Sequence, residues 1–133
     1  MGLLVVDVSA LVEVLFLTPR AKELNALLQD PSADLHAPAV CDLEFLSALR
    51  NGIFRGSFSP GRAEEALEDF SDLPLTRHGH QASLRRCFEL REVLSAYDAA
   101  YVALAEGLNA DLVTADQRLA RAAAALGQSC FSP

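Results

Sequence analysis

The sequence is poor in several residue types and motifs on which common classes of protein depend. Its three cysteines, Cys41, Cys87 and Cys130, are far apart and form no CxxC pair, so neither a zinc knuckle nor a disulfide framework is indicated. Free thiols in a reducing compartment account for them most simply. Lysine occurs once, at Lys22. The motifs GxxxxGK(S/T) and GxSxG are absent, which excludes a nucleotide P-loop and a nucleophile elbow.

Long apolar runs are also missing. The most hydrophobic stretch, residues 1–17, has no basic leader and is interrupted by Asp7 and Glu13, unlike a secretory signal. No other window approaches the roughly 20 apolar residues that a membrane-spanning helix requires. We therefore expect a cytoplasmic protein without a membrane segment.

Positive charge is scarce, with 11 Lys and Arg against 18 Asp and Glu and a net charge of −7. A nucleic-acid-binding protein usually carries a basic face, which this balance does not favour. However, eight of the ten arginines are grouped within residues 50–62, 85–91 and 118–121, and cations bound by carboxylates would offset negative charge locally. The same arginines are compatible with solvated helix faces. Net charge therefore leaves nucleic-acid binding open.

The apolar residues that are present predict one folded domain. They make up 51% of the 133 residues and run through nearly every segment, so a single domain over residues 1–133 can bury about two thirds of its unfolded surface. The pattern predicts strands at 3–6, 34–37, 73–76, 110–114 and 130–131, and helices at 8–16, 21–28, 39–49, 62–70, 81–90, 95–107 and 116–126. Asn51-Gly52 and Gly107 are expected to end two helices. This alternation predicts an α/β protein, a three-layer α/β/α sandwich with a mostly parallel central sheet.

Four acidic residues occupy positions where a carboxylate is unusual. Asp7 and Asp116 each follow a predicted strand, Glu44 lies in an apolar helix, and Asp98 opens another helix. In a parallel α/β sheet, the carboxyl ends of strands and the following helix N-termini meet at one edge. Carboxylates gathered there would repel one another unless a hard divalent cation held them together. The constellation predicts a metal-dependent enzyme that acts on phosphate esters.

Each of these acids also has a purely structural interpretation. Asp7 and Asp116 are good helix N-caps, although Ser9 and Thr114 are available for the same task. Ser95-Ala96-Tyr97-Asp98 matches a capping box. Glu44 has no basic residue three or four positions away, and an ionised carboxylate among apolar groups is costly unless a cation accompanies it. The argument for a site is collective, with Ser9 expected to orient Asp7 or to bind water around the metal.

The histidines do not share a ligand spacing with the acids. His36 is isolated, and His78-Gly79-His80 reads as an exposed loop. We therefore assign no metal to His36, His78 or His80.

Four blocks of the sequence resemble the signature blocks of PIN-domain proteins, and most of all the VapC-type ribonuclease toxins of bacterial toxin–antitoxin pairs. They are VVDVSAL at 5–11, the apolar helix around Glu44, YDAAYVALA at 97–105, and LVTADQRLA at 112–120. The blocks span almost the whole chain in the family's order and spacing, whereas residues 52–91 carry no signature. The family often has an acid, Asn or Ser near the last aspartate. This chain has Gln117 there, so the resemblance supplies no fifth ligand.

The resemblance implies an α/β/α sandwich that binds Mg²⁺ or Mn²⁺ through Asp7, Glu44, Asp98 and Asp116. It implies an endoribonuclease toxin that cleaves RNA phosphodiester bonds by means of metal-activated water. It also implies a homodimer in complex with a VapB-type antitoxin. Arg118 is expected either at the substrate phosphate or on a solvated surface.

Two alternative functions stay open from the sequence. The first is a PIN-like module that has lost catalysis and only binds a partner protein, against which the presence of all four acids argues. The second is an aspartate-dependent phosphatase of the dehalogenase type. Such an enzyme would need a second aspartate where this chain has Ser9, and a suitable lysine that the chain lacks.

Overall fold

A single parallel sheet forms the centre of the molecule. The computed structural model describes residues 2–133, and within them five strands pair in the order β3-β2-β1-β4-β5, every neighbouring pair being parallel. The strands are β1 (Gly2–Val6), β2 (Ala33–Pro38), β3 (Leu75–His78), β4 (Asp111–Val113) and β5 (Cys130–Phe131). The predicted parallel sheet is confirmed, and so is the last strand, which lies at an edge.

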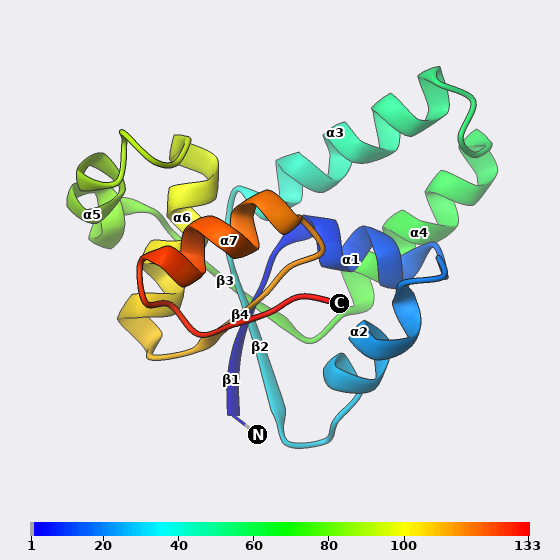
Figure 1. Cartoon of the computed structure of the whole chain (residues 1–133). Coiled ribbons are helices and arrows are strands. Elements are labelled where there is room, and N and C mark those ends of the chain that lie inside the picture. The colour runs from blue at the N-terminus through cyan, green and yellow to red at the C-terminus, as the bar shows by residue number, and fades with distance from the viewer. Residues whose placement is uncertain (1) are drawn as a thin grey trace.

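Helices cover both faces of this sheet. They are α1 (Val8–Leu15), α2 (Ala21–Leu28), α3 (Cys41–Phe54), α4 (Pro60–Asp72), α5 (Leu84–Glu89), α6 (Ala96–Leu108) and α7 (Gln117–Ala125). Strand order reverses direction after β3, so right-handed crossovers place α1 to α4 on one face and α5 to α7 on the other. Figure 1 shows these two groups on opposite sides of the strands. The predicted three-layer α/β/α sandwich is confirmed.

The central strands are apolar because they are covered on both sides. Val5, Val6, Leu112 and Val113 are fully buried in β1 and β4. The register pairs Val6 with Val113, so the ends of these two strands lie next to each other. Residues that follow them in sequence, Asp7 and Thr114 onward, therefore emerge at the same place on the sheet edge.

One predicted helix end is wrong, for a reason that involves tertiary packing. Helix α3 continues through Asn51-Gly52 and ends at Phe54. Gly52 is buried, and a Cβ atom added to it would lie 2.1 Å from Cζ of Phe58. The glycine thus permits the close approach of an aromatic ring. The turn after the helix is made by Gly56, whose φ is +73°.

Other element boundaries shift for local reasons. Helix α6 runs past Gly107 and ends where Asn109 adopts the left-handed conformation, with φ of 53°, which asparagine tolerates well. The helix predicted at 81–90 is divided into a 3₁₀ turn, Gln81–Ser83, and the short α5. Strand β3 begins two residues later than predicted, so His78 ends a strand and the prediction of an exposed loop there is wrong.

No helix within residues 2–133 is both long enough and apolar enough to span a membrane.

Candidate active site

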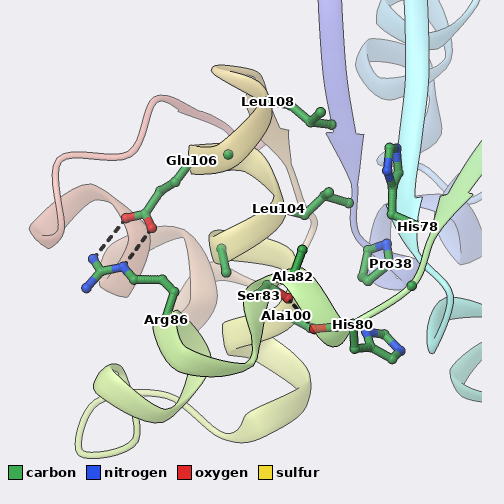
Figure 2. A pocket seen from close by; sticks show the side chains of 13 residues that line it. Pro38, His78, His80, Ala82, Ser83, Arg86, Ala100, Leu104, Glu106 and Leu108 are labelled. Atoms are coloured by element: carbon green, nitrogen blue, oxygen red, sulfur yellow. Dashed lines mark hydrogen bonds and ion pairs between the residues drawn. The ribbon is translucent and has the colours of Figure 1, made fainter.

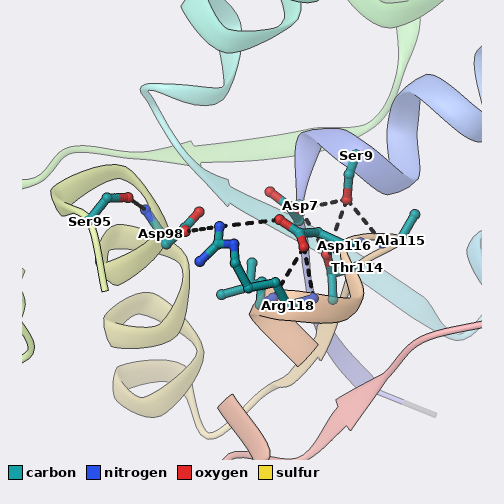
Figure 3. Close-up of polar contacts among 9 residues, drawn as sticks. Asp7, Ser9, Ser95, Asp98, Thr114, Ala115, Asp116 and Arg118 are labelled. Carbon is teal, nitrogen blue, oxygen red and sulfur yellow. Dashed lines mark hydrogen bonds and ion pairs between the residues drawn. The ribbon is translucent and has the colours of Figure 1, made fainter. Parts of the chain in front are cut away.

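The four predicted acids line one groove of about 750 Å³ at the carboxyl edge of the sheet. Asp7 connects β1 to α1, and Asp116 lies between β4 and α7. Glu44 and Asp98 come from the first turns of α3 and α6. Four elements that are distant in sequence thus contribute one carboxylate each. Figure 3 shows three of these acids with the residues that hold them.

Asp7 lies deepest, with 8% of its surface exposed. It occupies the N-cap position of α1, but within residues 2–133 its carboxylate accepts no cap hydrogen bond, so the capping interpretation is wrong for its side chain. Instead, Oδ2 accepts hydrogen bonds from Ser9 Oγ at 2.6 Å and Thr114 Oγ1 at 2.8 Å. Burial raises the pKa of Asp7; these hydrogen bonds oppose the rise, while Asp98 and Asp116 add to it.

Thr114 is a site residue that sequence reasoning weighed only as an alternative cap. It is fully buried, and its hydroxyl accepts a hydrogen bond from Asp116 N at 3.0 Å while donating to Asp7. Ser9 has the same arrangement, since its Oγ accepts from Ala115 N at 2.9 Å. Both hydroxyls thus lie within hydrogen-bond distance of the same oxygen of Asp7, and they also lie 3.1 Å from each other. The signal in the sequence is a hydroxyl residue that directly follows the apolar pair Leu112-Val113 and precedes Asp116 by two positions.

Glu44 is held by a buried phenol. Its Oε1 accepts a hydrogen bond from Tyr101 Oη at 2.7 Å, and Tyr101 is fully buried in α6. Burial raises the pKa of Glu44, Asp7 and Asp98 add to the rise, and the Tyr101 hydrogen bond opposes it. Burial also raises the pKa of Tyr101, so the phenol stays a donor. Sequence reasoning placed Tyr101 in the helix but assigned it no part in the site.

Asp98 forms only half of the predicted capping box. Ser95 Oγ accepts a hydrogen bond from Asp98 N at 3.1 Å, but the carboxylate is engaged elsewhere. Its Oδ2 accepts from a terminal nitrogen (Nη2) of Arg118 at 2.7 Å. The side chain of Asp98 therefore faces the groove instead of its own helix end.

Asp116 does cap a helix, as the structural interpretation proposed. Its Oδ1 accepts hydrogen bonds from Arg118 N at 2.9 Å and Leu119 N at 3.2 Å. Its Oδ2 lies 3.4 Å from Nη2 of Arg118. Capping uses one oxygen and leaves the other at the groove, so the two roles are compatible.

The chemistry of this donor set fits a hard divalent cation. Carboxylate oxygens are the ligands that Mg²⁺ and Mn²⁺ prefer, and within residues 2–133 Arg118 is the only cation in ion-pair contact with any of the four acids. The Arg118 guanidinium between Asp98 and Asp116 supplies positive charge at a place where a metal ion could supply it instead. No three His, Cys, Asp or Glu side chains in this part of the chain converge closely enough to ligate one ion directly. The acids therefore surround the groove without forming a closed cage.

A second hollow, of about 520 Å³, lies between α6 and the segment after β3 (Figure 2). His78 and His80 line it, together with the ion pair in which Arg86 Nε donates to Glu106 Oε1 at 2.8 Å. None of the four acids lines this hollow. His78 Nε2 lies 2.8 Å from Nδ1 of His36, so these histidines contact each other and not the acidic groove.

Residues 4–125 match the family model of the PIN domain, so the chain belongs to the PIN-domain family, and the resemblance seen in the sequence blocks is confirmed. Relatives from Mycobacterium tuberculosis include ribonuclease VapC12, 35% identical over 90% of this chain and 91% of the relative. Ribonuclease VapC9 is 40% identical over 88% of each chain. Ribonuclease VapC3 is 40% identical over 89% of this chain and 85% of its own.

A solved structure shares the fold. The crystal structure of VapBC2 from Rickettsia felis, bound to a DNA fragment from its promoter, matches with a TM-score of 0.65 over 98% of both chains at 16% sequence identity.

Proposed function

We propose that this protein is a metal-dependent endoribonuclease and the toxin of a toxin–antitoxin pair. The observation that carries the proposal is the convergence of four carboxylates, from four separate elements, on one groove. Relatives that are 35–40% identical over about nine tenths of the chain are named ribonucleases. RNA cleavage is therefore the chemistry that this groove supports best.

Asp7, Glu44, Asp98 and Asp116 would hold Mg²⁺ or Mn²⁺. When bound, such an ion polarises a phosphodiester oxygen and lowers the pKa of a water molecule that attacks phosphorus. Hydrogen bonds or ion pairs to named neighbours orient all four side chains. Asp7, Glu44 and Asp98 each use one oxygen in this way, whereas Asp116 uses both, because its Oδ2 also lies 3.4 Å from Nη2 of Arg118. Such anchoring limits side-chain rotation before any ligand arrives.

The surroundings of Asp7 and Glu44 favour a cation. Burial raises the pKa of both carboxyls, and each is raised further by the other acids of the groove. A positive ion reverses both effects because it favours the charged form. Ser9 and Thr114 orient Asp7, and Tyr101 orients Glu44.

A VapB-type antitoxin is the protein partner that we propose. Helix α3 exposes Leu43, Leu46 and Phe54, with 66%, 46% and 71% of their surfaces accessible, and Leu43 also lines the acidic groove. An antitoxin segment that packs on these side chains would cover the entrance to the groove. We further propose a homodimer that acts on cytoplasmic RNA.

The proposal is tested by an RNA cleavage assay on wild type, D7N and D69N. Asp69 is an exposed aspartate on α4, outside the groove, so D69N controls for the loss of one carboxylate. We expect wild type and D69N to cleave with Mn²⁺, to stop with EDTA, and to recover when Mn²⁺ is restored. We expect D7N to lose at least about 100-fold in rate while keeping its circular dichroism spectrum.

Cleavage by D7N at the wild-type rate, or cleavage that EDTA does not affect, would refute the proposed mechanism. A wild-type protein that binds its antitoxin but never cleaves RNA would instead support a binding module.

A further inference from the structure

Arg118 lies between two acids that come from different elements. Its Nη2 is 2.7 Å from Asp98 Oδ2 and 3.4 Å from Asp116 Oδ2, as Figure 3 shows. Asp98 belongs to α6, whereas Asp116 precedes α7. A single guanidinium nitrogen thus joins one side of the groove to the other. The sequence left Arg118 between a phosphate contact and a surface role, and in this structure its exposed side chain pairs with two acids of the groove.

The burial of the partners indicates that this contact can open easily. The Arg118 side chain is 61% exposed, whereas those of Asp98 and Asp116 are 17% and 35% exposed. Arg118 therefore approaches the acids from the solvent side. Across residues 2–133 its side chain makes no hydrogen bond other than those to the two carboxylates. Exposed ion pairs of this kind contribute little net stability, so the guanidinium can rotate into solvent without unpacking the core.

We propose that Arg118 is an internal, exchangeable counter-cation of the acidic groove. Its single positive charge offsets part of the negative charge of Asp98 and Asp116 when no divalent ion is present, and a divalent ion must displace it. Two positive groups repel each other and compete for the same two carboxylate oxygens, so guanidinium and metal exclude one another. The inference rests on the proposed metal site and adds a competitor that belongs to the chain itself.

This competition has a thermodynamic consequence that does not depend on catalysis. Whatever stabilises the metal-free state weakens metal binding by the same factor. Removal of Arg118 should therefore tighten metal binding and, in the absence of metal, leave the acids without a counter-charge. Displacement would also free the guanidinium at the mouth of the groove, where it can pair with a substrate phosphate.

The experiment compares R118Q with R121Q. Arg121 lies on the same helix α7 and is exposed, and no hydrogen bond or ion pair of its side chain occurs within the described residues. R121Q therefore removes the same charge without touching the acids. Mn²⁺ is titrated into each protein without RNA, and the free ion is followed by its electron paramagnetic resonance signal. We expect R118Q to bind Mn²⁺ about fivefold more tightly than R121Q, as the loss of two exposed ion pairs predicts.

Thermal unfolding supplies a second measurement on the same proteins. We expect R118Q to unfold at a lower temperature than R121Q in EDTA, and to gain more from Mn²⁺. Equal affinities for Mn²⁺, or weaker binding by R118Q, would overturn the competition while leaving the metal site in place. Failure of wild type and both variants to bind millimolar Mn²⁺ would overturn the metal site as well.

Discussion

The buried hydroxyl of Thr114 provides a sharp test of how the groove is held together. T114V keeps the shape of the side chain but removes the donor to Asp7 and the acceptor for Asp116 N. A hydrogen bond to a charged group contributes about 1.5–3 kcal/mol, and a backbone N–H left without a partner costs about 1–3 kcal/mol if water cannot reach it. Asp116 is only half-buried, so water can replace part of the second contribution. We expect T114V to lose about 2–3 kcal/mol of unfolding free energy.

The pH dependence of this loss follows from the pKa of Asp7. Burial raises that pKa in the folded protein, so ionised Asp7 lowers stability as pH rises through its folded value, and the stability is regained at lower pH. The Thr114 hydrogen bond favours the ionised form and limits this loss. Without it, the penalty of T114V should grow as pH increases, because ionised Asp7 then has one donor fewer.

Urea unfolding in EDTA, from pH 5 to pH 8, measures both effects. T76V is the matched control because Thr76 is exposed on β3. We expect T76V to stay within about 0.5 kcal/mol of wild type at every pH. The reasoning is refuted by a T114V penalty equal to that of T76V, or by a penalty that shrinks as pH rises.

Two further predictions concern the phenol at Glu44 and the packing of two glycines. Y101F removes the donor to Glu44, so we expect a loss of about 1–2 kcal/mol in the free energy of unfolding measured with urea. That hydrogen bond lowers the pKa of Glu44, so we also expect the acidic limb of the pH–rate profile for RNA cleavage to move to higher pH. An unshifted profile would exclude Glu44 as the titrating group. G52A should destabilise the protein by about 1–3 kcal/mol, because the added methyl would collide with Phe58. Gly107 is exposed and helical, and a Cβ atom added to it would meet no atom within 4 Å, so G107A should stabilise the protein by about 0.5–1 kcal/mol. Thermal unfolding that ranks these two variants in the opposite order would contradict the packing.

Local patterns in the sequence were sufficient to predict the layers of the fold and the positions of the acids along it. The strand Leu3–Val6 is apolar without alternation, which predicts a strand that is covered on both faces. Asp7 and Asp116 follow strands, and parallel strands end at a common edge. Those features depend on periodicity and chain order, which a sequence displays directly.

Contacts between residues that are distant in the sequence could be identified only in the folded structure. Thr114 meets Asp7 because β1 and β4 pair in the register that places Val6 beside Val113. Tyr101 reaches Glu44 because α6 and α3 both begin near this edge. Periodicity could place Thr114 and Tyr101 in buried positions, but it carries no information on the residue that each would face.

The same distinction explains the errors and the open alternatives. Asn51-Gly52 looks like a helix end because glycine favours such ends, but the packing of Phe58 on Gly52 gives that glycine another purpose. The sequence did not indicate that Arg118 pairs with Asp98, because the two residues meet only in the folded chain. The order of strands and helices along the chain determines which residues lie at the carboxyl edge of the sheet, and that order can be predicted from neighbouring residues and from the periodicity of apolar positions. The side chain that each group contacts depends on where remote segments close on one another, and only the packed molecule defines those distances.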